Sequence, residues 1–405
     1  MIQRKVAKVI TGSLATTAGD ALEAHSNLLP IDLLFNKILY RNATHIASLP
    51  NTHPLQSLAR KAAKCFVKKH CSPLHYLFFT TKVNLSSIKT INITQCRPSY
   101  SPPFSTTTLS DKQEALAAAI NHHQTQVSVY SDSSGYENGV GASAVMYINN
   151  KTEKHSLYYY LSPLSDHIVY KGEIVGLILA LHLLKSIHFQ LLSYTIIGTD
   201  NQAVIKALSN QTSHPAHYLL DQVHDMAEQL QTAQYQLTNT ITRHPPTKNV
   251  IDLQIHWTPG HSSFPPNVRA NELAKQAAQG SSSPCNTLPT SLHKTPIPSS
   301  TSALRQSNLS SLKKIWKTHW KSSPRYPKTH AINKSLPSAN FLKLTAPLLS
   351  SEFRRRCRVQ SRARRWLQLV GCAALLLDAS NFGGLDGVGE SGIEPRRSLR
   401  KTRVS

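Results

Sequence analysis

The amino-acid sequence predicts an α/β fold for the central part of the chain, with five strands in one mixed sheet and helices flanking it. Stretches of alternating apolar and polar residues, typical of half-buried strands, are interrupted by stretches with helical apolar spacing. Two predicted strands run directly into aspartates, Asp132 and Asp200, and Glu173 opens a strongly apolar helical stretch. Carboxylates at strand ends lie at the sheet edge where open α/β folds bind ligands. We therefore expect this edge to hold the functional site.

The expected strands follow one another along the chain at 125–132, 139–149, 154–161, 193–199 and 251–257. The first of them alternates Val127 and Val129 with polar residues, as a half-buried strand does. Helices are expected at 111–122, 167–187, 201–209, 215–232 and 267–279. The helix over 215–232 carries its apolar residues on one stripe, which predicts a face packed on the core.

Asp132, Glu173 and Asp200 are the strongest candidates for a metal site. Each also has an ordinary explanation: a cap for a turn at Ser133-Ser134-Gly135, a first-turn acid of a helix, and, with Asn201, a helix N-cap. Three converging carboxylates repel one another unless divalent cations lie between them. Strand, helix and strand carry the three residues in the order that one metal site requires, so we expect them to bind metal together.

A loop that reads His256-Trp257-Thr258-Pro259-Gly260-His261 precedes the last predicted helix. Together with the three carboxylates, this loop resembles type 1 ribonuclease H. That family has an aspartate on the first strand with a Gly/Ser turn after it, a glutamate on the first helix, an aspartate at the end of the fourth strand, and a Trp-x-Pro-Gly-His loop. The resemblance spans about 120–280 and implies a ribonuclease H-like domain over 124–280.

The resemblance implies an activity, the hydrolysis of the RNA strand of RNA/DNA hybrids, and a cofactor, Mg²⁺, with Mn²⁺ as a substitute. It implies that Asp132 bridges two ions, that Glu173 and Asp200 complete the two sites, and that His261 assists water activation or product release. Contacts to nucleic acid are expected from residues beside the two aspartates, namely Ser133, Ser134, Gly135 and Asn201. Proteins distinguish RNA from DNA by contacts to 2′-hydroxyls, so nucleic acid is the expected partner.

One position departs from the family's pattern. The family has a fourth carboxylate five residues into an Asn-Glu-x-Ala-Asp stretch, and the stretch 267–271 here puts Asn271 at that place. An alignment shifted by four residues puts Lys275 there instead. An asparagine carbonyl contacts cations but carries no charge, so Asn271 is expected to be a weak metal ligand.

Two functions are therefore open: a hybrid ribonuclease, active or impaired, and a non-catalytic nucleic-acid-binding remnant of the same fold. A related integrase- or exonuclease-type nuclease is a third, weaker interpretation. The Trp-Thr-Pro-Gly-His loop argues against that third class.

The formal net charge of +24 is unevenly distributed. Residues 1–100 contain thirteen Lys and Arg against three Asp and Glu, and residues 281–405 contain twenty-two against five. Residues 121–280 contain nine Lys and Arg against eleven Asp and Glu. Basic flanks around a slightly acidic module favour a polyanionic partner, which the flanks attract while the carboxylates hold metal. For any single lysine, a solvated surface is the simpler explanation.

The flanks have distinct compositions. Residues 1–97 are predicted to form basic helices and resemble the segment after the polymerase domain in fungal non-LTR retrotransposon reverse transcriptases. The sequence has no Tyr-x-Asp-Asp polymerase signature, so the chain is expected to begin after that domain. A generic basic helical arm explains the same pattern. The other expected regions are a linker with a short helix at 98–123, a disordered linker at 281–302, a basic helical tail at 303–348, and an Arg/Gly-rich tail of uncertain origin at 349–405.

The six cysteines show no paired Cys-x-x-Cys spacing. This argues against a zinc module and against a disulfide scaffold, and it fits a reducing intracellular compartment, nuclear or cytoplasmic. The N-terminus lacks the apolar core of a signal peptide, and the apolar run 367–377 is too short to cross a bilayer. We therefore expect no membrane contact.

Overall fold

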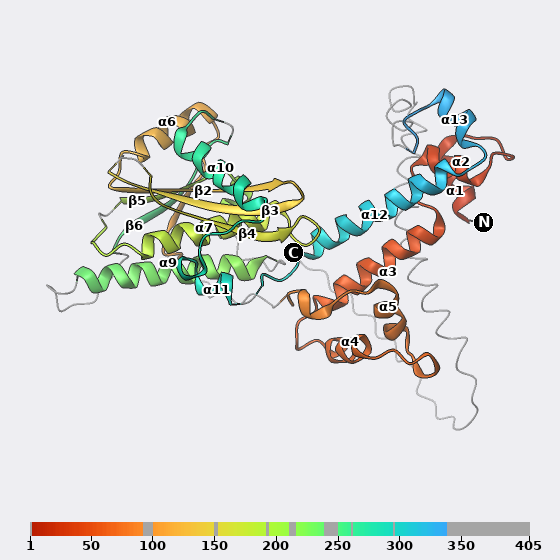
Figure 1. Ribbon diagram of the computed structural model, residues 1–405, viewed down its shortest axis with the longest axis horizontal. Helices are drawn as coiled ribbons and strands as arrows, with labels where there is room; N and C mark the ends of the chain where they lie inside the picture. The colour runs from red at the N-terminus through yellow and green to blue at the C-terminus, as the bar shows by residue number, and fades with distance from the viewer. Residues whose placement is uncertain are drawn as a thin grey trace, which may run out of the picture.

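The structure, a computed structural model, describes residues 2–91, 100–149, 153–191, 194–209, 216–238, 250–260, 262–294 and 296–337. They form two lobes, one built on a sheet and one built of helices (Figure 1). The predicted Arg/Gly-rich tail, 349–405, and the last part of the predicted helical tail lie outside these residues. Within the ranges given, no helix is both long and apolar enough to cross a membrane.

Six strands form one mixed sheet in the order β1-β6-β5-β2-β3-β4. Their bounds are β1 Ser105–Thr107, β2 Val127–Tyr136, β3 Gly139–Ile148, β4 Glu153–Pro163, β5 Tyr194–Thr199 and β6 Asp252–Trp257. β2, β3 and β4 are antiparallel neighbours, whereas β5, β6 and β1 continue from β2 in parallel. The mixed α/β architecture is thereby confirmed, with one strand more than the five predicted.

The additional strand, β1, lies in a segment whose Ser, Thr and Pro content predicted only a linker. It pairs with β6, where Ser105 is opposite Gln254. Phe104, immediately before the strand, is buried in the main core and anchors it. A strand at a sheet edge pairs through its backbone, so three polar residues are enough to form it. Its side chains do not alternate between apolar and polar, and the sequence therefore gives no sign of the strand.

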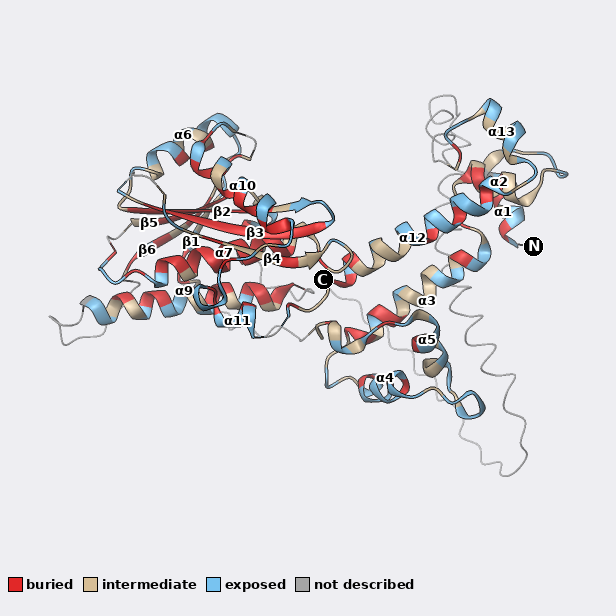
Figure 2. Cartoon of the chain, in the orientation of Figure 1, coloured by how far each residue is buried: buried red, intermediate tan, exposed pale blue. Residues whose placement is uncertain are grey.

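Helices cover both faces of the sheet (Figures 1 and 2). α7 (Val169–Lys185) and α9 (His217–Thr238) lie on one face, and α6 (Lys112–His122) and α10 (Pro265–Ala278) lie on the other. α8 (Gln202–Ser209) follows β5. α7 packs between the sheet and α9, which explains why it is buried around its whole circumference and lacks a polar face.

β2 does not end at Asp132, so the predicted turn at Ser133-Ser134-Gly135 is wrong. The strand continues to Tyr136, and the turn into β3 is made by Glu137 and Asn138, with φ of 47° and 68°. Two successive left-handed residues are the geometry of a tight type I′ hairpin. The strand stays extended because β3 pairs with it along its whole length, beyond the point at which β5 ends.

The segment 281–302 is ordered where the structure describes it, so the prediction of a disordered linker is wrong there. It contains the 3-10 helix η3 (Cys285–Thr287) and the short helix α11 (Thr290–His293). Leu292 is buried in the main core, and Tyr159 Oη donates a hydrogen bond to its carbonyl oxygen at 2.8 Å. A few spaced apolar residues anchor the segment to the sheet lobe despite its high Ser, Thr and Pro content.

The helical lobe combines the two ends of the described chain (Figure 1). It contains α1 Ile2–Thr11, α2 Gly19–Ser26, α3 Ile31–Ala47, α4 Pro54–Lys64, α5 Pro73–Thr81, α12 Thr301–Lys321 and α13 Tyr326–Ile332. α12 runs along α3, and Leu312 and Trp316 are buried against Leu29 and Leu33. The regions expected at 1–97 and 303–348 therefore pack on each other in their described parts. Their resemblance to a reverse transcriptase segment remains a prediction.

Candidate metal centre

Parallel pairing of β2 with β5 brings the two aspartates together. The last pair in register is Ser131 with Thr199, so Asp132, within β2, and Asp200, directly after β5, are the next residues along the two chains. α7 packs on these strands and contributes Glu173. Ligand oxygens of the three carboxylates all lie within 4.8 Å of one another. The three residues are thus assembled, while their binding of metal remains a prediction.

Two glycines allow α7 to approach the sheet closely beside this cluster. A Cβ on Gly172 would lie 2.8 Å from Ser133 Cβ, and a Cβ on Gly176 would lie 3.2 Å from the Ser143 carbonyl oxygen. Glu173 follows the first glycine directly, so this close packing brings its carboxylate to the sheet edge. Neither glycine was among the predicted site residues. Two glycines four residues apart in an otherwise apolar helix are nevertheless a recognisable sign of close packing.

Burial and mutual repulsion raise the pKa values of the carboxylates. Asp132 is 5% exposed and Glu173 is 4% exposed. Burial, together with the negative charge of Asp200, raises the pKa of Asp132 to about 7. Burial and the charges of both aspartates raise the pKa of Glu173 well above its ordinary value. Three such groups repel one another strongly when ionised, so the site favours a cation among them.

Glu173 also has a buried oxygen, Oε2, without a hydrogen-bond partner in the described part of the chain. Such an oxygen is costly unless a ligand satisfies it. The nearby side chains of Ser133 and Asn201 partly offset the rise in the pKa of Glu173. The candidate donors are carboxylate oxygens, which are the ligands that Mg²⁺ and Mn²⁺ prefer. The residues therefore fit a hard divalent cation.

One cation of the chain itself acts on this site. The positive charge of Lys275 lowers the pKa of Asp132, as does the hydrogen bond that the Ser133 backbone N–H donates to Asp132 Oδ1 at 2.7 Å. Lys275 is exposed on α10, one turn after the half-buried Asn271, so the two residues share one side of the helix. Metal binding by Asn271 remains a prediction.

The loop after β6 packs against Asp200. Trp257 Nε1 donates a hydrogen bond to the Asp200 carbonyl oxygen at 3.0 Å. Gly260 lies so close to the Asp200 carboxylate that a Cβ at this position would collide with it. The Trp-Thr-Pro-Gly sequence therefore positions this aspartate from the side of β6. His261, predicted to assist catalysis, lies outside the described residues.

The four predicted nucleic-acid contacts lie beside the carboxylates. Asn201 caps α8, where its Oδ1 accepts hydrogen bonds from two backbone N–H groups of the first turn at 3.0 and 3.2 Å. Ser133 Oγ donates to a backbone carbonyl of α7 at 3.1 Å. Ser134 is half-buried and Gly135 is exposed near the end of β2. Asn201 and Ser133 thus have structural roles, and contact of all four residues with nucleic acid remains a prediction.

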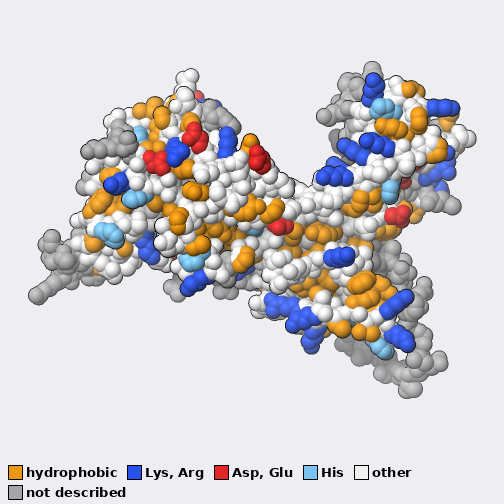
Figure 3. All heavy atoms as spheres, viewed as in Figure 1, with side chains coloured by type: hydrophobic (Ala, Val, Ile, Leu, Met, Phe, Trp, Pro, Cys, Tyr) orange, Lys and Arg blue, Asp and Glu red, His pale blue; other side chains and the backbone are white. Residues whose placement is uncertain are grey.

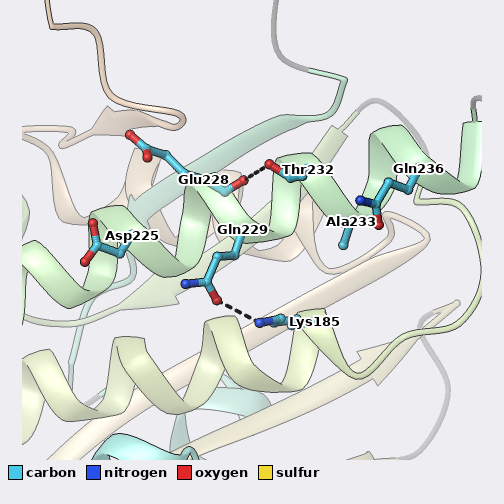
Figure 4. A pocket seen from close by; sticks show the side chains of 7 residues that line it. All are labelled: Lys185, Asp225, Glu228, Gln229, Thr232, Ala233 and Gln236. Atoms are coloured by element: carbon cyan, nitrogen blue, oxygen red, sulfur yellow. Dashed lines mark hydrogen bonds between the residues drawn. The ribbon is translucent and has the colours of Figure 1, made fainter.

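A separate hollow lies between α7 and α9 (Figure 4). It is lined mainly by polar and charged side chains, including Lys185, Asp225, Glu228 and Gln229. Lys185 Nζ donates a hydrogen bond to Gln229 Oε1 at 2.7 Å across it. The residues drawn there include none of the three clustered carboxylates, and Ala233 is the one apolar residue among the described residues that line the hollow, whereas small-molecule sites are lined mainly by apolar residues. It is not part of the candidate metal centre.

No family model matches this chain, and no curated protein matches it. Among solved structures, the ribonuclease H1 of the halophilic archaeon Halobacterium salinarum NRC-1 is similar at 18% identity, over 38% of this chain and 98% of its own, with a TM-score of 0.27. LC11 ribonuclease H1 in complex with an RNA/DNA hybrid is similar at 14% identity, over 38% of this chain and 96% of its own, with a TM-score of 0.25. The foamy viral protease-reverse transcriptase in complex with dsDNA is similar at 15% identity, over 39% of this chain and 96% of its own, with a TM-score of 0.27. At these values, none of them assigns an activity to this chain.

Proposed function

We propose that the sheet lobe hydrolyses the RNA strand of RNA/DNA hybrids endonucleolytically, using Mg²⁺ or Mn²⁺ held by Asp132, Glu173 and Asp200. The observation that carries this proposal is the cluster of three carboxylates at one sheet edge, with a buried Glu173 oxygen that lacks a partner. The packing of the Trp257–Gly260 loop against Asp200 supports it, because this loop and this aspartate are both part of the type 1 ribonuclease H pattern. A retroelement origin is proposed from the resemblance of residues 1–97.

The residues of the chain have separate tasks in this reaction. Strand pairing fixes Asp132 and Asp200, and the close packing of α7 fixes Glu173, so the ligand oxygens are in place before substrate arrives. Divalent cations bound there supply activation of water and stabilisation of the leaving 3′ oxygen.

Incubation of the full chain with a hybrid labelled on its RNA strand tests the proposal. We expect a ladder of RNA fragments that requires Mg²⁺ or Mn²⁺ and disappears with EDTA, with the DNA strand left intact. Hydrolysis of the RNA strand alone reflects recognition of 2′-hydroxyls. A hybrid that stays intact at every Mg²⁺ and Mn²⁺ concentration contradicts catalysis, and cleavage of the DNA strand contradicts the assigned substrate.

A second candidate function is nucleic-acid binding without turnover. Asn271 favours it because the fourth carboxylate of the family pattern is replaced by a neutral amide. Lys275 favours it further, since its positive charge already acts on Asp132 and opposes the binding of a cation there.

Asn271→Asp distinguishes the two functions. The added carboxylate is expected to increase hybrid cleavage and to lower the Mg²⁺ concentration for half-maximal rate by on the order of 10- to 100-fold. The measurement is the rate of RNA-strand cleavage against Mg²⁺ concentration. Gln276→Asp is the matched control, because it adds the same charge to an exposed position on another side of α10.

Four outcomes are informative. No activity in wild type or either variant, with no Mg²⁺ binding by calorimetry, supports the binding remnant. An equal gain from Gln276→Asp shows a general charge effect. Efficient cleavage by wild type at low Mg²⁺ contradicts an impairment by Asn271. A gain from Lys275→Asp alone supports the shifted alignment.

A further inference from the structure

A cluster of aromatic side chains lies on the helical lobe, away from the carboxylates. Phe66 lies between α4 and α5, and Phe79 lies on α5. Their rings stack in parallel, with centroids 4.0 Å apart and planes 12° apart. Tyr76 meets Phe66 edge-on, with centroids 5.3 Å apart and planes at 83°. These three residues are the aromatic platform.

The platform is partly exposed to solvent, and its three residues are not part of the hydrophobic core of the lobe. Phe78 fills the core and is 4% exposed, whereas its neighbour Phe79 is 59% exposed. Tyr76 is 49% exposed. One face of Phe79 lies on Phe66, so the exposed part of its ring is available to extend the stack. Large exposed apolar groups that gather in one place mark binding surfaces.

The sequence around the platform is basic. The sequence contains no Asp or Glu between Asp32 and Asp111. Lysines flank the platform at the end of α4, in the 3-10 helix η1 (Lys68–His70) and after α5, and the exposed basic residues nearest to it in sequence are Lys64, Lys68, Lys69, His70 and Lys82. Figure 3 shows hydrophobic side chains bordered by Lys and Arg over the part of the lobe that contains α4 and α5.

We propose that the aromatic platform and its lysines form a second nucleic-acid site, which binds single strands. An unpaired base stacks on the free part of Phe79 and continues the Phe66–Phe79 stack, while the lysines contact the phosphates on either side. Aromatic platforms in basic surroundings bind single strands with little sequence preference, since every base has a π-face. A duplex offers phosphates to the lysines but keeps its bases stacked internally, so it leaves the platform unused.

Fluorescence anisotropy with the full chain tests this inference. The probes are labelled oligo(dT) and oligo(U) of roughly 20 nucleotides, longer than a single-strand site of about 4–16 nucleotides, and a blunt duplex of equal length. Phe79→Ala is expected to weaken binding of both single strands by about 5- to 100-fold, the range for one base stacked on an aromatic ring. It is expected to leave duplex binding unchanged. Phe35→Ala is the matched control, because Phe35 is 40% exposed on α3, outside the platform.

The double variant Lys68→Gln/Lys69→Gln tests the contribution of charge. Its affinity for oligo(dT) is expected to depend less steeply on salt, by about 0.7 in the slope of log K against log[salt] for each phosphate that the variant leaves unneutralised. Thermal melting of each variant serves as a check on folding, and exposed positions are expected to leave the melting temperature unchanged.

Three results overturn the inference. They are unchanged oligonucleotide binding by Phe79→Ala, an equal loss for duplex and single strands, and a change in sedimentation without a change in binding, which would make the platform a protein-association surface. The inference does not depend on hydrolysis by the sheet lobe. A chain that binds oligo(dT) through Phe79 but does not cut hybrids contradicts only the proposed function, and a chain that cuts hybrids with Phe79→Ala binding oligo(dT) normally contradicts only this inference.

Discussion

Asp132→Asn is expected to abolish the cleavage of RNA/DNA hybrids, with a loss of at least about 100-fold in rate. Asp132 interacts electrostatically with both other carboxylates, and its replacement removes one charge from the candidate metal ligands. The measurement is the rate of RNA-strand cleavage under saturating Mg²⁺. Asp225→Asn is the control, because Asp225 is an exposed carboxylate on α9 and belongs to the hollow away from this cluster. Undiminished cleavage by Asp132→Asn contradicts the metal assignment.

The same substitution is expected to stabilise the metal-free fold at neutral and alkaline pH. The pKa of Asp132 is about 7 in the folded protein against an ordinary value of 3.8, so folding disfavours its charged form. The resulting loss of stability in wild type begins as the pH rises above about 4 and is complete above about 7. We therefore expect Asp132→Asn to unfold at higher denaturant concentration than wild type at pH 8, by on the order of a few kcal/mol, and to match it at pH 4. A difference that is equal at both pH values contradicts this explanation. EDTA in both samples excludes bound metal.

Gly141→Ala is expected to lower the free energy of unfolding by about 1–3 kcal/mol and the melting temperature by roughly 2–12 °C. A Cβ at Gly141 would collide with backbone atoms of Ala274 and Ala278 in α10. Backbone of a packed helix cannot move aside as a flexible side chain does, so the whole helix has to shift. Gly19→Ala is the control, because no atom lies within 4 Å of a Cβ there. Equal melting temperatures for Gly141→Ala and wild type contradict the close packing of α10 on β3.

The strands and helices of the sheet lobe were predictable because each has a strong apolar pattern. α7 is an example, because it is strongly apolar over 174–181 and buried there on every side. β2 carries the predicted Val127 and Val129, although it is buried on both faces over 127–133 and not half-buried as predicted. Both elements are stabilised by burial of their apolar side chains, so the apolar pattern of the sequence and the packing in the structure reflect the same hydrophobic free energy. The clustering of the three carboxylates was predictable from their order on a strand, a helix and a strand, although Asp132 lies within β2 and not at its end, and Glu173 lies beyond the first turn of α7.

Features that depend on backbone pairing or on distant packing were not predictable in this way. β1 forms through hydrogen bonds to β6, and its side chains carry no pattern. The extension of β2 beyond Asp132 depends on where β5 ends, which only the assembled sheet determines. Gly172 acts through a close contact with Ser133 on another element, and the sequence of α7 alone does not name that partner.

The order in which the chain is synthesised separates the two lobes in time. α12 covers the apolar side chains at the start of α3. Arg305 Nε on α12 donates a hydrogen bond to Thr44 Oγ1 on α3, and the two residues are 261 positions apart in the sequence. At about 5–20 residues per second, a nascent chain waits on the ribosome for roughly 10–50 s before α12 reaches α3. During this interval Leu29 and Leu33 lack the cover of Leu312 and Trp316. A product that terminates between the sheet lobe and α12 therefore retains all six strands and the three clustered carboxylates. It leaves the apolar side chains of Leu29 and Leu33 exposed, which makes it a substrate for chaperones and proteases.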